Sequence, residues 1–208
     1  MASVRLVRVE RRPHFNTKRD GFVIRNLFMV LVPDADPADR VVHVDDLSET
    51  TIVPVPSASA AVEVAASFGE LHLVELYGGL GFEAAAAVLA VVPGVPVGFP
   101  GAALPPVASA VLFEDPNANP ATARWTFGNT TVVAVPSTAS APAVAASLVA
   151  AGAERVELCG GMGPVPAAEV AAAVDVPVTP VLFGFESLPA AAAYRAHFEE
   201  AVSQTPNG

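Results

Sequence analysis

The chain has 208 residues, of which 52% are hydrophobic, and its 21 acidic and 11 basic residues give a formal net charge of −10. This composition is typical of a globular protein with a large core and excludes disorder for most of the chain. A single cysteine, Cys159, excludes an internal disulfide framework, a cysteine-based zinc cluster and an iron–sulfur site.

The charge is distributed unevenly along the chain. Residues 1–25 form a basic N-terminal arm with seven basic and two acidic residues, whereas the rest of the chain has four basic and 19 acidic residues, a net charge of −15. Because an acidic body repels phosphate groups, we expect no nucleic-acid partner. The alternation of charged and aliphatic residues over 4–9 suits an edge strand, which would pack on the acidic body or on a second subunit of a homodimer.

Membrane and secretory signals are not expected either. The first twelve residues, MASVRLVRVERR, contain no continuous apolar stretch of the kind found in secretory signals. No apolar run reaches the roughly 18 residues that are needed to cross a bilayer. We therefore expect a cytoplasmic protein with no membrane partner.

The chain contains an internal duplication, because four segments recur 80–83 residues later in the same order. We divide the chain into repeat one (26–105), repeat two (106–186) and a C-terminal helix and tail (187–208). The recurring pairs are 33–38 with 116–121, 53–57 with 133–137, 74–81 with 156–163, and 95–97 with 176–178.

Strands and helices alternate within each repeat. Apolar or β-branched runs predict the strands, and alanine-rich segments with Val or Leu at helical spacing predict the helices. The predicted strands are 27–32, 51–55, 71–76 and 95–99 in repeat one, and 111–113, 131–135, 155–158 and 176–183 in repeat two. The predicted helices are 59–68, 82–92, 140–151, 165–174 and 187–202.

This α/β alternation predicts parallel strands joined by right-handed crossovers. Eight strands then form either a (β/α)8-barrel-like fold with pseudo-twofold symmetry or two flavodoxin-like open sheets that face each other. Glu75 and Glu157 favour the barrel. Each lies on the strand face opposite its apolar neighbours, and a barrel interior accepts charged groups that a helix-covered sheet face does not.

The strongest chemical signal is the doubled motif Glu-Leu-(Tyr/Cys)-Gly-Gly-x-Gly. Glycines between a parallel strand and a helix can aim backbone N–H groups at a carboxylate, a phosphate or an oxyanion. The alternative is that they only permit a tight turn. The candidate ligand-binding glycines are Gly78, Gly79, Gly81, Gly160, Gly161 and Gly163.

Four side chains of the same motif are candidate catalytic groups. Glu157, or Glu75 in repeat one, is a candidate general base if burial raises its pKa. Cys159 and Tyr77 are candidate proton donors, and Cys159 precedes a predicted helix whose N-terminus lowers a thiol pKa. The structural alternatives are acids that bind their own glycine loops, and a cysteine that acts as a small buried hydrophobe.

Other polar residues give weaker signals. Asp34 and Asp36, whose counterparts are Asn117 and Asn119, precede a proline and suit turns and caps better than a cation site. His43 beside Asp45 and Asp46 is a weak metal pattern that we interpret as a solvated loop. We therefore expect no metal and no cofactor.

Residues 156–163, Val-Glu-Leu-Cys-Gly-Gly-Met-Gly, resemble a family of small bacterial proteins, catalogued as a domain of unknown function, whose members are about one repeat long. In that family a strand that reads Ile-Glu-Leu-Cys-Gly-Gly-Phe-Gly follows an alanine-rich helix, and an Asp-Pro segment follows the first strand, as at Asp36 and Pro37. The resemblance covers both repeats and implies a fused pair. It carries the motif over to Glu157 and Cys159, and to Glu75 with Tyr77 in place of the cysteine.

Two functions are compatible with these patterns. The first is a metal-free isomerase or lyase that acts by acid–base chemistry on a small anionic or carbonyl-bearing metabolite. The second is a non-catalytic ligand-binding or assembly protein. A polar pocket that contains both glutamates would favour the enzyme, and glutamates fully paired with backbone groups would favour the second function.

Overall fold

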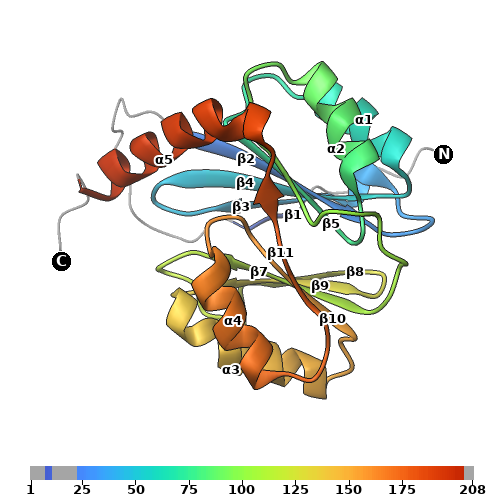
Figure 1. Ribbon diagram of the computed structural model, residues 1–208, viewed down its shortest axis with the longest axis vertical. Coiled ribbons are helices and arrows are strands. Elements are labelled where there is room, and N and C mark those ends of the chain that lie inside the picture. Colours follow the sequence, from blue (N-terminus) through green and yellow to red (C-terminus); the bar gives the residue numbers. More distant parts are fainter. Residues whose placement is uncertain (1–7, 11–22, 204–208) are drawn as a thin grey trace.

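The computed structural model describes residues 8–10 and 23–203, which form two β-sheets that face each other with helices on their outer faces (Figure 1). Helices α1 (Ala58–Ser67) and α2 (Phe82–Val91) cover the sheet of repeat one. Helices α3 (Ala141–Ala150) and α4 (Pro164–Ala173) cover the sheet of repeat two. The molecule therefore has four layers, with the two sheets inside.

The first sheet contains seven strands in the order β1-β3-β4-β2-β5-β6-β12. Strand β2 is central and pairs in parallel with both β4 and β5. The strands are β1 (Arg8–Glu10), β2 (Ile24–Leu31), β3 (Val41–Val44), β4 (Ser48–Val55), β5 (Leu73–Tyr77), β6 (Val97–Phe99) and β12 (Leu182–Phe183).

The second sheet repeats this pattern with five strands in the order β11-β10-β7-β9-β8. Strand β7 is central and pairs in parallel with β9 and β10. The strands are β7 (Ser109–Glu114), β8 (Arg124–Phe127), β9 (Thr130–Val135), β10 (Arg155–Leu158) and β11 (Val178–Pro180). The duplication in the sequence is thus a duplication of one sheet with its two helices.

The prediction of purely parallel strands is wrong at one equivalent place in each repeat, and also where β12 pairs antiparallel with β6. Strand β3 pairs antiparallel with β4, and its counterpart β8 pairs antiparallel with β9. Each pair is joined by only a few residues, and a short connection permits only antiparallel pairing, whereas a parallel pair needs a crossover. These two short strands have no counterpart among the predicted elements.

The two sheets are open, so the predicted barrel is not observed and the alternative of two facing sheets fits the structure better. The argument for a barrel assumed that helices cover both faces of an open sheet. In the structure helices cover only the outer face of each sheet, and the inner face packs against the other repeat (Figure 1). The glutamates therefore lie between two sheets rather than inside a barrel.

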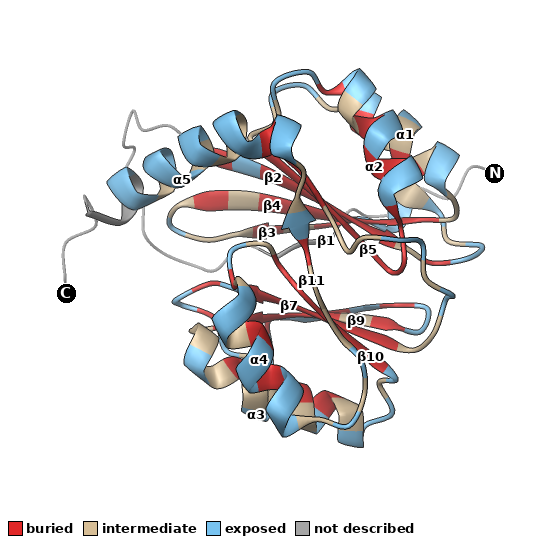
Figure 2. Ribbon diagram, in the orientation of Figure 1, coloured by how far each residue is buried: buried red, intermediate tan, exposed pale blue. Residues whose placement is uncertain are grey.

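The strand residues of repeat one divide between the two faces of the sheet, and Val74 and Leu76 lie on the face opposite Tyr77, as their alternation predicts. Leu27, Met29, Val74 and Leu76 belong to an apolar cluster with α1 and α2. Phe28, Val30 and Tyr77 belong to a second cluster that includes residues of repeat two. The ring of Phe28 lies edge-on to Tyr77 and to Phe113, with 5.5 Å between ring centroids in each case. Figure 2 shows both sheets mostly buried and the outer helix surfaces exposed.

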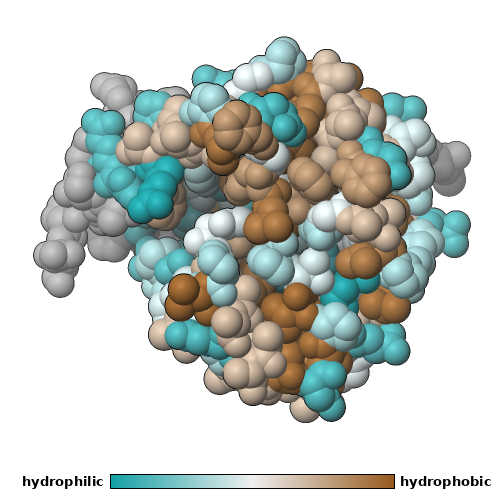
Figure 3. Space-filling view, in the orientation of Figure 1, coloured by the Kyte–Doolittle hydropathy of each residue, from teal (hydrophilic) through white to brown (hydrophobic). Residues whose placement is uncertain are grey.

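The end of the chain returns to repeat one. Strand β12 pairs antiparallel with β6, and helix α5 (Leu188–Ser203) follows a short 3-10 helix, η3 (Phe185–Ser187). Hydrophobic residues reach the surface where β12 leads into α5 (Figure 3), among them Leu182 and Phe185. Within the part of the chain that the structure describes, every helix is too short or too polar to cross a bilayer.

The N-terminal arm contributes one described strand. β1 pairs in parallel with β3, with Arg8 opposite Val41. The predicted edge strand over 4–9 overlaps β1 at Arg8 and Val9, and its first four residues lie outside the described part of the chain. Strand β3 is therefore covered on its outer side by a segment of the arm.

The interpretation of the Asp-Pro loops as caps is confirmed. The Asp36 carboxylate accepts a hydrogen bond from the N–H of Ala38 at 2.9 Å, at the start of the 3-10 helix η1 (Pro37–Asp39). Asn119 does the same for Ala121 at 3.0 Å. A second such helix, η2 (Thr138–Ser140), precedes α3.

Candidate functional site

Glu75 and Glu157 lie between the two sheets and are almost inaccessible to solvent, with 1% and 0% of their surface exposed. Each lies on the strand that directly precedes its glycine loop, at equivalent positions of β5 and β10. The inward direction of both acids, which the sequence predicts, is observed. What surrounds them decides which chemistry they can support.

Each glutamate binds the glycine loop of the other repeat. The N–H of Gly160 donates to Oε1 of Glu75 at 2.9 Å. The N–H of Gly78 donates to both carboxylate oxygens of Glu157, at 3.1 Å and 3.0 Å. The two acids and two loops thus form a reciprocal pair of contacts about the pseudo-twofold axis. The predicted anion-binding loops do bind carboxylates, but the carboxylates belong to the same chain.

Side chains complete the hydrogen bonding of both acids. The Tyr77 hydroxyl donates to Oε2 of Glu75 through a short hydrogen bond. The Nε of Arg155 donates to Oε1 of Glu157 at 3.0 Å, and Arg155 also donates to the carbonyl oxygen of Pro105. Glu157 therefore has a cationic partner, whereas Glu75 has only neutral ones.

The pKa values of the two acids reflect this difference in partners. Burial raises the pKa of Glu75 to about 7, and the hydrogen bonds from Tyr77 and Gly160 only partly oppose this effect. Burial also raises the pKa of Glu157, while the charge of Arg155 lowers it. Such a pKa suits a general base, but a base must also reach its substrate.

Cys159 and Tyr77 are buried next to Glu75. Burial raises the pKa of the Cys159 thiol to about 12, and the charge of Glu75 adds to this effect. The expected lowering of the thiol pKa by the following helix is therefore wrong, because desolvation outweighs the helix end. Burial likewise raises the pKa of Tyr77 well above its ordinary value. Both groups are neutral near pH 7.

The six glycines of the motif have different roles. Gly78 and Gly160 supply the N–H groups that bind the acids. A Cβ on Gly79 or on Gly81 would lie 2.4 Å from the Leu104 oxygen or 2.2 Å from the Ala103 nitrogen, so these two permit close packing against a loop. Gly163 begins α4 at a φ of 64°, and a Cβ on Gly161 would make only an ordinary contact with the Cys159 sulfur at 3.8 Å.

Neither acid lines any of three hollows in the described structure. Their volumes are about 590, 160 and 200 Å³, and none of them includes Glu75, Glu157, Tyr77 or Cys159. The largest of the three lies beside β8, between that strand and the segment from Val32 to Val41. The motif that the sequence emphasises therefore lies apart from all three of these hollows.

The sequence patterns miss one buried polar cluster. His43 of β3 lies beside Asp115 of repeat two, with 3.0 Å between Nε2 and Oδ2, and these residues are 5% and 1% exposed. The interpretation of His43 as part of a solvated loop is therefore wrong. Asp115 is 72 residues away, so no local pattern links the two. The only sequence signal is that its repeat-one counterpart is an apolar residue, Val32.

Comparison with known protein families places both repeats. A family model described as "Family of unknown function (DUF6506)" matches residues 24–103 and again residues 107–196. The chain belongs to this family. It contains two tandem copies of the DUF6506 unit, in agreement with the duplicated sheets.

Other comparisons add little. No curated protein matches the chain. A solved structure described as the ABC domain in complex with L-Trp from Streptococcus pneumonia is similar over 89% of this chain and 86% of that chain, with 8% identity and a TM-score of 0.29. A similarity this weak does not define a shared fold.

Proposed function

We propose that this DUF6506 protein is a non-catalytic binding protein that takes up an extended peptide segment as an added strand on the free edge of β8. The observation that carries the proposal is the outer edge of β8, which no described strand covers, beside the 590 Å³ hollow. The arrangement of the motif residues supports a structural role for them. Both glutamates and both leading N–H groups of the glycine loops are engaged with each other.

The edge of β8 offers unpaired backbone groups. The N–H of Ala134 in β9 donates to the carbonyl of Ala123, just before β8. In an antiparallel pair of strands, every second residue forms hydrogen bonds with the partner strand. Trp125 and Phe127 therefore also direct their backbone groups toward β9. The N–H and C=O groups of Arg124 and Thr126 then lie on the outer side. Among the described strands, none pairs with this side. Such an edge is a template for strand addition.

The side chains around this edge define what would fit. Trp125 and Phe127 are buried toward repeat one, whereas Arg124 and Thr126 are exposed. A strand added to β8 would face the same two environments, so we propose a segment that alternates apolar and polar residues. The net charge of −15 over residues 26–208 favours a basic over an acidic segment.

The other repeat provides a precedent within the same molecule. Strand β3 holds the position in repeat one that β8 holds in repeat two, and its outer edge pairs with β1. Strand β1 comes from the basic arm and has the sequence Arg-Val-Glu. An edge of this type therefore accepts a short strand of alternating character.

A peptide titration tests the proposal. The probe is a synthetic peptide, Val-Arg-Leu-Val-Arg-Val, and its charge-reversed form carries Glu in place of both Arg residues. Trp125 is the only tryptophan in the chain and lines the hollow, so its fluorescence should change as the peptide binds. We expect saturable binding of the basic peptide and weaker binding of the acidic one.

Two variants at one position identify the backbone edge as the site. Thr126→Pro removes an outward N–H without removing a bond of the β8–β9 ladder, and we expect it to abolish binding. Thr126→Val keeps that N–H and should bind like the parent protein. Equal binding by both variants, or no saturable fluorescence change with the basic peptide, would overturn the proposal.

A further inference from the structure

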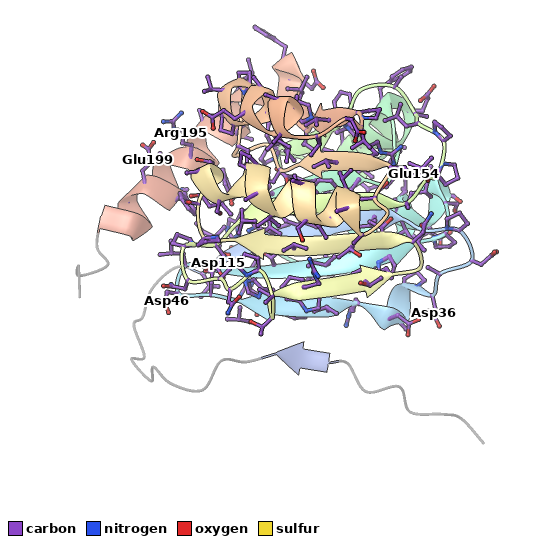
Figure 4. All side chains as sticks on the ribbon, turned by 90° about the horizontal axis from the view of Figure 1, so that it is seen from below. Asp36, Asp46, Asp115, Glu154, Arg195 and Glu199 are labelled. Carbon is purple, nitrogen blue, oxygen red and sulfur yellow. The ribbon has the colours of Figure 1, made fainter. Side chains whose placement is uncertain are left out.

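Three side chains from both repeats meet in one cluster near the edge where the sheets face each other. His43 ends the inward face of β3, Asp45 follows that strand, and Asp115 follows β7 of repeat two. One ligand atom from each residue lies within 4.8 Å of the other two. In Figure 4, the labelled Asp115 lies with Asp46 at one end of the sheets, away from Asp36 at the opposite end.

The separations suit the coordination sphere of a cation. Donor atoms about 2.1 Å from a metal lie roughly 3 to 4 Å apart, depending on the geometry. The distance between His43 Nε2 and Asp115 Oδ2 is 3.0 Å, and an oxygen of Asp45 lies within 4.8 Å of both donors. The cluster therefore has the size of a metal site, and a small rotation of the Asp45 side chain would close the remaining gap.

Hydrogen bonds hold both carboxylates in orientation. Asp115 accepts from the N–H of Asn117 through Oδ1 at 2.8 Å, which leaves Oδ2 toward His43. Asp45 accepts from the N–H groups of Leu47 and Ser48 and from the Ser48 hydroxyl. Outer partners of this kind orient the ligands of metal sites.

The cluster is not required by the fold, because the other half of the molecule lacks it. Val32 stands at the position of Asp115 in the repeated Pro-Asx-Ala segment. Phe127, opposite Thr130, stands at the position of His43, opposite Thr50. The same sheet–sheet packing therefore forms with apolar residues at both positions. Two carboxylates beside one imidazole are an added feature of one end only.

Charge also favours a bound cation, because the carboxylates of Asp45 and Asp115 repel each other. The surroundings are largely apolar, since the rings of Phe113 and Trp125 lie 5.7 Å and 5.1 Å from the His43 ring, measured between centroids. A cation shared by both carboxylates would offset this repulsion.

We propose that His43, Asp45 and Asp115 bind one divalent first-row transition-metal ion, of the class of Zn²⁺ or Mn²⁺. A mixed set of one imidazole and two carboxylates suits these ions, whereas Ca²⁺ prefers oxygen ligands alone. Three protein donors leave coordination positions for water or for an added ligand. Asp45 is only half-buried and adjoins the exposed Asp46, which gives the ion a route from solvent.

Equilibrium dialysis of the full chain, stripped of metal with a chelator, tests the proposal. We expect one equivalent of Zn²⁺ or Mn²⁺ to be retained, and Ca²⁺ to bind more weakly. Asp115→Asn and His43→Phe should each weaken binding at least about tenfold, because loss of a ligand costs at least as much as loss of an outer partner. Asp36→Asn is the matched control, since it changes an exposed acid in the equivalent loop and should bind like the parent chain.

An NMR measurement on the parent chain tests the same site without depending on whether the variants fold. Paramagnetic Mn²⁺ should broaden the imidazole NMR signals of His43 at substoichiometric amounts and leave those of His72 unchanged. The absence of stoichiometric Zn²⁺ and Mn²⁺ binding would overturn the proposal. So would broadening that spares His43, or a folded Asp115→Asn variant that binds like the parent chain.

Discussion

At the scale of single residues, Glu75 and Glu157 are buried carboxyl groups, and a carboxylate that is removed from water needs hydrogen-bond partners within the protein. Glu75 finds only neutral donors, from Tyr77 and the Gly160 backbone. Glu157 has the Arg155 guanidinium as well as the Gly78 backbone. Two equivalent positions thus carry different electrostatic environments, and Glu75 is the one poised to take up a proton near neutral pH.

The raised pKa of Glu75 predicts a specific pH dependence of stability. Its pKa is about 7 in the folded state against 4.5 ordinarily, so the folded protein holds this proton more tightly than the unfolded chain does. The stabilisation is fully present below about pH 4.5 and is lost as the pH rises through about 7, at up to about 1.4 kcal/mol per pH unit. We expect Glu75→Gln to remove this contribution, which urea denaturation at pH 5 to 8 would measure.

The substitution is chosen so that hydrogen bonding survives. A glutamine at this position can accept from Gly160 and donate to the oxygen of Tyr77, as a protonated glutamate does. Glu83→Gln, at the exposed start of α2, is the control and should leave the pH profile of the parent unchanged. Parallel pH profiles for Glu75→Gln and the parent protein would contradict the assignment.

At the scale of elements, the glycine loops after β5 and β10 join each strand to its helix and also join the two repeats. Gly78 adopts a φ of 73° and sends its N–H across the interface to Glu157. Gly160 has no such backbone constraint but approaches Phe183 and Glu75 closely. The loops are therefore fixed by contacts with the opposite repeat.

This packing predicts contrasting effects of two alanine substitutions. At Gly78, a Cβ would lie 2.6 Å from the Leu31 nitrogen, and the alanine would have to adopt the left-handed conformation of this glycine. We therefore expect a loss of about 3 kcal/mol or more in unfolding free energy. At Gly161, the nearest atom to a Cβ is the Cys159 sulfur at 3.8 Å, so the change should stay within about 0.5 kcal/mol. Chemical denaturation of both variants would compare them directly. Equal destabilisation would contradict the different packing of the two glycines.

At the scale of the whole molecule, the sheet–sheet interface makes the two repeats a single cooperative unit. One apolar cluster contains Phe28 and Tyr77 of repeat one together with Phe113 and Trp125 of repeat two. The reciprocal glutamate contacts lie in the same interface. Neither sheet can lose its partner without exposing this inner face to water.

If the repeats unfold cooperatively, a destabilising substitution in repeat one should also lower the unfolding midpoint of repeat two. Val74 is fully buried under α1 and α2, and Val74→Ala should cost about 2 kcal/mol. We expect the urea midpoint seen by Trp125 fluorescence, in repeat two, to fall together with the midpoint seen by far-UV circular dichroism. A Trp125 transition that does not move, with a second phase in the dichroism, would show that the repeats unfold separately.

Much of the architecture and part of the candidate site are readable from the sequence. The duplication, the order of the main strands and helices, and the opposite directions of Val74 and Glu75 follow from local patterns of period two and of helical period. The doubled motif also draws attention to Glu75 and Glu157, which lie in the sheet–sheet interface. These features are determined by residues close together in the chain.

Only the tertiary structure decides what those residues meet. The bonds from Gly78 to Glu157 and from Gly160 to Glu75 join residues 79 and 85 positions apart, and His43 meets Asp115 across 72 positions. Such contacts arise from the packing of one sheet on the other, which strand periodicity does not encode because the same inward face suits a barrel or a pair of sheets. The packing therefore turns the expected open site into a set of buried contacts between the repeats, and the proposed binding sites, at the edge of β8 and at His43, lie elsewhere.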